Sequence, residues 1–296
     1  MRAFAETLGL EVDGSYRHYV AWPGDRIVTS VVATRPREIE AAGFWFPIVG
    51  RVPYKGYFDP ALAHDQAETL RADGLDVCEV SVRAYSTLGW FDDPVTGPML
   101  RQPEGDLVET LLHELVHATA FVSSQPEFNE GVASFIGQEA SVRFYTEHEG
   151  DSEAAGQRKR VGLRRRIRNE MLELRDGIAG LYASDASADE IAAQRATLEA
   201  ATRARIATLP FENGRAEAYA GQLRLNDACL ALTATYGGDA HCYEAALEDL
   251  GGALEALVAA LRGAAESDDP RTALFGSCAT LDSIEAGSPS SNPAPE

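Results

Sequence analysis

The stretch that decides the fold is His113-Glu114-Leu115-Val116-His117, followed at short distance by Asn129-Glu130. Two histidines four residues apart on a helix project from the same face, one turn above the other. Both imidazoles can therefore reach one zinc ion, and the glutamate between them can polarise a zinc-bound water. Glu130 would be the third protein ligand. Three protein ligands and one open position are typical of a catalytic zinc site, whereas four ligands close a structural one.

The sequence around this motif predicts a buried amphipathic helix from Asp106 to Val122. Its apolar residues recur at helical spacing; they are Leu107, Val108, Leu111, Leu112, Leu115, Val116 and Phe121. Histidines inside such a helix are costly to bury without partners, and a metal supplies one. The alternative is a pair of core histidines satisfied by backbone carbonyls, and the spacing with Glu114 and Glu130 favours the metal.

A turn and a second helix are predicted directly after the motif. Ser123-Ser124-Gln125-Pro126 is polar and contains a proline, so it indicates a turn. A helix starting near 127–129 would fold Glu130 back over the two histidines. Glu130 could instead be a carboxylate favoured by the helix dipole, but its place beside the histidine helix favours a ligand.

Several segments resemble a bacterial family of predicted zinc aminopeptidases of the gluzincin type, in which two histidines and one glutamate bind zinc. The resemblance covers roughly residues 1 to 250. It rests on residues 85–95 (YSTLGWFDDPV), HELVH, residues 128–130 (FNE), and the segments 45–50, 52–58, 181–184 and 225–228.

This resemblance implies one Zn²⁺ held by His113, His117 and Glu130, with Glu114 as the general base of a peptidase. Two departures are visible. Family members usually begin with a lipoprotein-like signal and a helical segment upstream of the point where this chain starts, and Asp227 stands where the family more often has asparagine. The resemblance leaves the substrate open.

The composition of the chain limits the classes of function that the protein can have. The 296 residues carry a formal net charge of −20, which argues against nucleic-acid binding and is compatible with a cationic substrate such as a peptide amino terminus. No apolar run approaches a membrane span, and residues 1–25 lack an apolar signal-peptide core. A cytoplasmic location and the cell envelope or periplasm, which the family resemblance suggests, both stay open, as does the oligomeric state.

The four cysteines are scattered and contain no C-x-x-C pair, so no cysteine zinc site is expected. Cys229 and Cys242 could pair if the protein is exported, although four cysteines allow three pairings. Free thiols in a reducing compartment are the alternative.

The predicted fold class is α+β, with a small N-terminal sheet packed on a mainly helical, zincin-like region. Strands are expected over 27–33, 44–57 and 75–85, and a helix over 60–72. We expect one metallopeptidase domain over 1–275, mixed α/β over 15–100 and mainly helical over 105–265. A long helical hairpin is predicted over 140–209 and a disordered tail over 277–296.

Other residues are candidates for supporting roles. The strand Val77–Tyr85 could bind extended peptide along an edge. Ser134 and Glu109 are candidates for orienting the histidines. The basic stretch 158–168 predicts a solvated helix face or contacts with acidic residues. Candidate oxyanion donors are Tyr57, Tyr85, Tyr219, Tyr236 and His241, and candidate ammonium-binding carboxylates are Asp92, Asp93 and Glu127.

The favoured hypothesis is zinc-dependent peptide hydrolysis, with Glu114 taking the proton of the attacking water. An aminopeptidase and an endopeptidase both fit the motif. A non-catalytic zinc protein that binds a partner through its helical hairpin is a further alternative, but zinc binding alone would not require Glu114.

Overall fold

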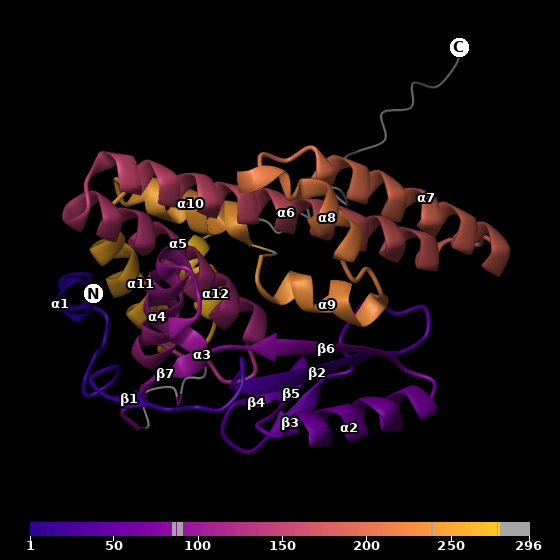
Figure 1. Ribbon diagram of the computed structural model, residues 1–296, viewed down its shortest axis with the longest axis horizontal. Coiled ribbons are helices and arrows are strands. Elements are labelled where there is room, and N and C mark those ends of the chain that lie inside the picture. Colours follow the sequence, from indigo (N-terminus) through magenta and orange to yellow (C-terminus); the bar gives the residue numbers. More distant parts are fainter. Residues whose placement is uncertain (85–86, 88–90, 238, 277, 279–296) are drawn as a thin grey trace, which may run out of the picture.

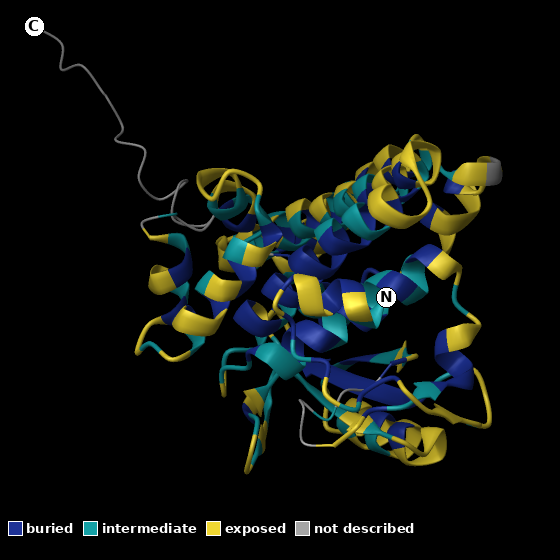
Figure 2. Cartoon of the chain, turned by 90° about the vertical axis from the view of Figure 1, so that its left-hand side faces the viewer, coloured by how far each residue is buried: buried dark blue, intermediate teal, exposed yellow. Residues whose placement is uncertain are grey.

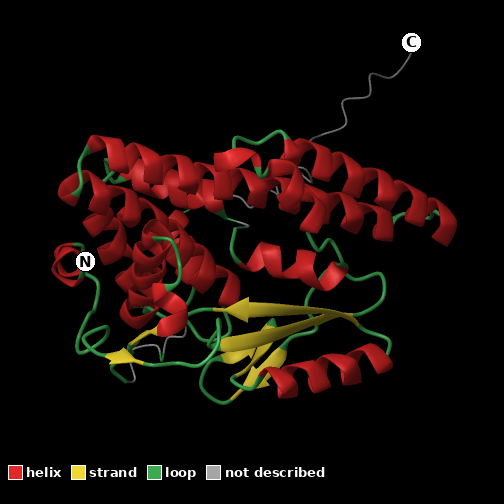
Figure 3. Cartoon of the chain, viewed as in Figure 1, coloured by secondary structure: helices red, strands yellow, loops and turns green. Residues whose placement is uncertain are grey.

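The computed structural model describes residues 1–84, 87, 91–237, 239–276 and 278. A small sheet lies along one side of the molecule, with α2 (Pro60–Ala72) on one face, α9 (Asp227–Thr235) on the other, and the remaining large helices above (Figures 1 and 3). This arrangement confirms the predicted α+β class. None of the described helices is long and apolar enough to span a membrane.

The centre of the sheet is β2 (Val28–Thr34), in which all seven residues are buried. It pairs antiparallel with β5 (Tyr54–Tyr57) on one side and with β6 (Asp76–Val82) on the other. Alternate residues of a strand point to opposite faces. Val31 packs toward α2 and Val32 toward α9, so helices cover both faces.

The aromatic stretch 44–57 forms three short strands. They are β3 (Phe44–Phe46), β4 (Gly50–Val52) and β5, where one bent strand or two were expected. β3 and β4 pair as a hairpin, and Pro53 separates β4 from β5. The proline cannot donate a ladder hydrogen bond, which explains the break. The helix expected over 60–72 is confirmed as α2, with Asp59 capping its amino end.

The N-terminal segment runs along the helical part of the molecule. It contains α1 (Arg2–Thr7) and β1 (Tyr19–Val20), and β1 pairs in parallel with β7 (Val95–Thr96). The short α3 (Gly97–Leu100) then leads into the helical region.

The histidine helix is α4 (Glu104–Thr119), and α5 (Pro126–His148) packs directly on it. The hairpin consists of α6 (Asp151–Ala183) and α7 (Ala188–Ala207), so it begins later than the predicted residue 140. Gly150, with φ of +93°, separates α5 from α6 in a conformation that glycine favours. The remaining elements are a 3₁₀ turn (Glu212–Gly214), α8 (Ala216–Gln222), α10 (Ala240–Asp249), α11 (Leu254–Ala265) and α12 (Pro270–Phe275).

Buried residues concentrate in the centre of the sheet and in the helices above it, whereas the outer faces of α2 and of the hairpin are exposed (Figure 2). The largest apolar cluster surrounds α4 and α5 and includes Leu112, Leu115 and Ile136. The motif helix therefore lies in the main core.

All four cysteines form disulfides, and the pairing suggested for Cys229 and Cys242 is wrong. The bonds are Cys78–Cys229 and Cys242–Cys278. Cys229 lies in the first turn of α9, against β6, while Cys242 lies in α10 near the residues after α12, so each has a closer partner. Cys278 falls within the predicted tail, and residues 279–296 lie outside the described part of the chain, so the disorder predicted for them stays a prediction.

Candidate metal centre and active site

Close packing of two helices brings the site together. A Cβ atom built on Gly137 of α5 would lie 3.1 Å from the backbone nitrogen of His113 and 3.2 Å from the carbonyl oxygen of Glu109. Any side chain here would press on the α4 backbone. The glycine therefore allows α5 to approach α4 at the level of the first histidine.

Asn129 fixes the turn between these helices. Its side-chain oxygen accepts a hydrogen bond from the Val122 backbone nitrogen at 2.9 Å, and its side-chain nitrogen donates to the Val122 carbonyl at 2.7 Å. This double contact holds Val122 outside the helix, so α4 ends at Thr119 and not at the predicted Val122. The predicted turn is present, and Pro126 begins α5.

The side chains of His113, His117 and Glu130 converge. The two Nε2 atoms lie 3.1 Å apart, and Oε2 of Glu130 lies 3.3 Å from His113 Nε2 and 3.5 Å from His117 Nε2. Metal–ligand distances near 2.0–2.1 Å place neighbouring tetrahedral ligands about 3.3 Å apart. The three donors thus have the spacing of one face of a zinc tetrahedron and could hold a metal ion.

The second oxygen of Glu130 has its own partner. The Tyr54 hydroxyl, delivered by β5, donates to Oε1 at 3.1 Å. Burial alone would raise the pKa of Glu130, but the adjacent His117 and His113 outweigh it and lower the pKa strongly. Burial likewise opposes the charged form of His113, yet Glu130 and Glu114 raise its pKa overall. Both shifts are those expected when Glu130 is negatively charged.

Glu114 is half-buried on α4, next to His113 in the sequence. Burial raises its pKa, against the effect of the two histidines, while Glu130 and Asp93 add to the increase. Tyr16, from the N-terminal segment, lies in the electrostatic field of Glu114 and Asp93. Tyr236, directly after α9, lies in the field of Glu130, Tyr54 and Glu114. The charge of Glu114 therefore contributes to raising the pKa of two tyrosines that are distant from it in sequence.

One known family covers most of the chain. The sequence model of the family described as "Putative aminopeptidase" matches residues 1–274. The chain belongs to the putative aminopeptidase family. No curated protein and no solved structure matched the chain. Membership in the putative aminopeptidase family supports a peptidase, and hence a hydrolase, acting on peptide substrates.

The oxyanion-donor candidates separate clearly in this aminopeptidase-family structure. Among the candidates that fall in the described residues, only Tyr236 has a pKa shift to which Glu130 and Glu114 contribute. Tyr57 donates to Gln66 of α2, and the Tyr219 ring lies tilted against Phe211, with the ring centroids 4.9 Å apart. His241 lies against Cys242. Tyr85 lies outside the described residues.

The ammonium-binding candidates do not converge either. Asp93 is buried, Asp92 is exposed, and Glu127 lies in the first turn of α5, where it lines the cavity described below. Tyr16 and Tyr54 were missed as site residues by sequence reasoning. Tyr54 stands in one of the family segments, but nothing in the sequence connects it with Glu130 across 76 residues.

The residues expected to orient the histidines have other roles. Glu109 forms an ion pair with Arg164 of α6, and Ser134 is buried without a hydrogen bond to either imidazole in the described part of the chain. Nδ1 of His117 is buried without a hydrogen-bond partner among the described residues. The expectation for Glu109 is thus corrected, since its contact is with the hairpin.

The basic stretch of α6 pairs in part with the acidic remainder of the molecule. Arg164 bonds Asp106 at 2.8 Å in addition to Glu109, and Arg165 bonds Glu139 at 2.7 Å. These contacts join α6 to the motif helix pair. They confirm the interpretation of this stretch as partly engaged with neighbouring acids.

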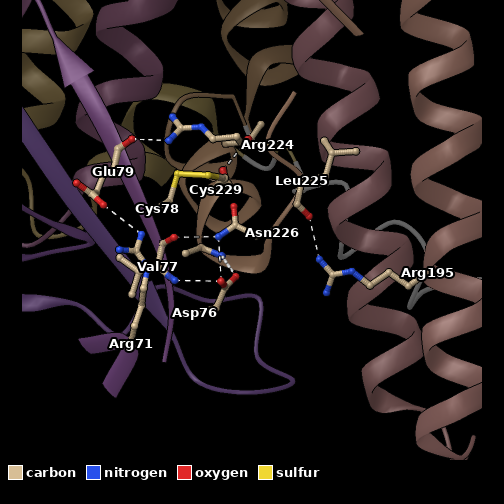
Figure 4. Close-up of a disulfide and its surroundings, with 12 residues drawn as sticks. Arg71, Asp76, Val77, Cys78, Glu79, Arg195, Arg224, Leu225, Asn226 and Cys229 are labelled. Carbon is tan, nitrogen blue, oxygen red and sulfur yellow. Dashed lines mark hydrogen bonds and ion pairs between the residues drawn. A yellow bond between two sulfur atoms is a disulfide. The ribbon is translucent and has the colours of Figure 1, made fainter. Parts of the chain in front are cut away.

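The strand nominated for peptide binding is an edge strand, but its first half is covered. The Val77 carbonyl accepts from the Asn226 side chain at 3.1 Å, and the Glu79 carbonyl accepts from Arg224 at 2.7 Å (Figure 4). Cys78 is bonded to Cys229 in the same region. The exposed part of this edge begins at Ser81, close to the end of β6.

A cavity of about 650 Å³ is lined by residues that include the sequence neighbours of Tyr54 and Tyr236. Its walls come from β4, the first turn of α5, α6 and α9. Glu127, one turn before Glu130, and Thr235, next to Tyr236, are among its lining residues. The three metal-donor residues are not among the residues that line it.

Proposed function

We propose that the protein is a zinc-dependent aminopeptidase in which His113, His117 and Glu130 hold one Zn²⁺ and Glu114 is the general base. The observation that carries the proposal is the 3.1–3.5 Å spacing among the three donor atoms. Two imidazoles and one carboxylate form the donor set of catalytic zinc sites in peptidases. The remaining tetrahedral position is left for water or substrate.

Bound zinc would supply a Lewis acid that polarises the scissile carbonyl and makes water more acidic. Glu114 takes the proton from the attacking water and passes it to the leaving amine. Its half-buried position favours this exchange, because burial raises the pKa of the carboxyl toward the range in which it can both accept and release a proton.

Tyr236 is the proposed oxyanion donor. Burial, with Glu130 adding to it, raises the pKa of its hydroxyl well above the usual value, so the group stays protonated and can donate. Substituting such a donor typically lowers kcat by about 10²–10³-fold.

The peptide beyond the cleaved bond has room in the cavity described above. Its volume of about 650 Å³ is within the range of small-ligand sites. Binding of several substrate residues in this cavity would also be compatible with an endopeptidase. Cleavage of amino-terminally blocked peptides would rule out strict aminopeptidase action and favour that alternative.

The disulfides support a location outside the reducing cytoplasm. All four cysteines are paired, and structural disulfides persist in oxidising compartments such as the periplasm. We include this location in the proposal because the resemblance to exported family members points the same way.

The test combines metal analysis with peptide cleavage. Purified protein should contain about one zinc per chain. Glu130→Ala should lower that content, and unchanged stoichiometry would remove Glu130 from the ligand set. Glu114→Gln should keep zinc and lose hydrolysis. A Glu114→Gln variant as active as wild type would contradict the mechanism, and a zinc-loaded wild type that cleaves no peptide would favour a non-catalytic zinc protein that binds partners.

A further inference from the structure

The second disulfide lies within a set of potential metal ligands. Cys242, in the first turn of α10, is bonded to Cys278, which follows α12. The Nε2 atom of His241 lies 3.4 Å from the Cys242 sulfur. The ligand atoms of these three residues all lie within 4.8 Å of one another. Two thiolates and one imidazole can bind Zn²⁺, but the disulfide keeps both sulfurs from acting as thiolates.

The other disulfide has different surroundings. In the part of the chain that the structure describes, neither Cys78 nor Cys229 belongs to a cluster of three potential metal ligands. The donor set is therefore specific to the second disulfide and does not accompany every cysteine pair. The first disulfide provides an internal control for any effect of reduction.

Contacts of Arg271, in α12, hold the two ends of this cluster together without the sulfur atoms. The guanidinium bonds the carboxylate of Asp239, just before α10, at 2.8 and 3.2 Å, and it donates to the Cys278 carbonyl at 3.2 Å. The rings of Tyr243 and Phe275 also join α10 to α12, with their centroids 4.8 Å apart. Breaking the bond between the sulfurs removes none of these contacts. A site that is held in place binds its ligand at a lower entropic cost.

The surroundings also favour thiolates and allow access. The Arg271 guanidinium lies 3.9 Å from the Cys242 sulfur, and a neighbouring cation stabilises a thiolate relative to a thiol. His241 and Cys278 are only half-buried. Arg271 and Asp239 line the cavity of about 650 Å³, which gives a small reductant or a metal ion a route to this region.

We propose that reduction of the Cys242–Cys278 disulfide creates a second metal site, in which both thiolates and His241 bind one Zn²⁺ ion. A dithiol supplies the two electrons. Its two thiol groups become a disulfide, and the two cysteines each gain a proton. The metal ion then replaces these two protons, which are released to solvent. The S–S bond and the metal exclude each other, so the same cysteines link α10 to the residues after α12 in either state.

The change from one state to the other needs only a local rearrangement. Zn–S distances near 2.3 Å place two thiolates of a tetrahedral site about 3.8 Å apart. The Cα atoms of Cys242 and Cys278 lie 5.8 Å apart, so side-chain rotation can separate the sulfurs to this spacing. This inference does not rest on the proposed function, because the site shares no residue with the candidate metal centre of α4 and α5.

Titration with Co²⁺ tests the proposal. Co²⁺ can take the place of Zn²⁺ in tetrahedral sites, and thiolate ligands give it a charge-transfer band that imidazole and carboxylate ligands do not. The centre at His113, His117 and Glu130 contains no sulfur and does not contribute to this band. Wild type reduced with dithiothreitol, which is then removed under argon, should show the band and bind about one more Co²⁺ per chain than the oxidised protein.

Variants assign the band to one disulfide. Reduced Cys242→Ser/Cys278→Ser should lack it, and reduced Cys78→Ser/Cys229→Ser should keep it. His241→Ala should weaken Co²⁺ binding at least about 10- to 100-fold, because the loss of even an outer partner of a metal ligand costs that much. His148→Ala, at the exposed carboxyl end of α5, is the matched histidine control.

Three results would overturn the second metal site. They are a reduced wild type without the band, a band that remains in Cys242→Ser/Cys278→Ser, and equal Co²⁺ affinities in His241→Ala and His148→Ala. If Cys78→Ser/Cys229→Ser does not fold, reduced wild type and Cys242→Ser/Cys278→Ser carry the comparison. Zinc content and peptide cleavage of the oxidised protein test the proposed function separately.

Discussion

The Tyr54 hydroxyl holds one oxygen of Glu130 at 3.1 Å, while the other oxygen of the same carboxylate faces the Nε2 atoms of both histidines. A strand of the sheet thereby orients a ligand on a helix. Hydrogen bonds to metal-binding carboxylates fix their direction and strengthen metal binding. The sheet is consequently part of the candidate metal centre, although none of the three donor residues belongs to it.

Removing this contact should weaken zinc binding. Tyr54→Phe is expected to reduce zinc affinity about 10- to 100-fold, the usual effect of losing such a partner. Competition with a chromogenic chelator measures the change. Tyr57→Phe is the control, because the Tyr57 hydroxyl in the same strand bonds Gln66 and not Glu130. Equal zinc affinities in the two variants would contradict the role of Tyr54.

Adding one methyl group between α4 and α5 should disturb the site. Gly137→Ala forces a Cβ atom within 3.2 Å of the α4 backbone at His113, which cannot move as a side chain could. We expect a loss of about 1–3 kcal/mol in the free energy of unfolding, together with weaker zinc binding.

The control for this substitution is Gly162→Ala in α6. A Cβ atom there meets nothing within 4 Å. Alanine in an open helical position should raise the free energy of unfolding by about 0.5–1 kcal/mol. Denaturant titrations of both zinc-free variants measure the two changes, and a change of the same sign in both would contradict the packing argument.

The two disulfides should contribute unequally to stability. Cys78–Cys229 links residues 151 positions apart and Cys242–Cys278 links residues 36 apart. Chain entropy in the unfolded state predicts about 5 kcal/mol for the longer loop and about 4 kcal/mol for the shorter one. Paired alanine variants, unfolded by denaturant without reductant, give the comparison. A larger loss from the shorter loop would show that native-state contacts outweigh chain entropy.

Filling the cavity should discriminate against longer substrates. Ala234→Trp, on α9, places an indole in the cavity of about 650 Å³. We expect kcat/KM for a hexapeptide to fall at least about tenfold, while a dipeptide, which needs less room, is affected less. Ala200→Trp, on the exposed face of α7, controls for the added bulk. Equal losses of kcat/KM for both peptides would show that the cavity does not bind the longer substrate.

The helix pair and its turn could be predicted because their signals are local. The apolar spacing around His113 and His117, the break at Pro126 and the proximity of Glu130 all lie within 25 residues. The same holds for β2 and α2, whose boundaries agree with the expectation to within one residue. Local periodicity and capping residues determine these elements.

The rest of the site depends on long-range packing, which leaves no local pattern. The Tyr54 hydroxyl contacts Glu130 from a strand that lies 76 residues away in the sequence. The sequence alone does not tell whether the hydroxyl of a tyrosine has a structural or a functional role. The disulfide pairing could not be predicted for the same reason, because three pairings of four cysteines fit the sequence equally well. The limits of the predicted domain and tail stay predictions.

The covalent link between β6 and α9 also determines what a break in the chain would do. Residues 184–187 join α6 to α7 at the exposed tip of the hairpin, where the backbone is accessible. A single cut there leaves an N-terminal piece that contains Cys78 and a C-terminal piece that contains Cys229, and the disulfide keeps them in one molecule. Such a nicked protein would migrate as one species before reduction and as two species after it. Before reduction, the disulfide still attaches α9 to the sheet.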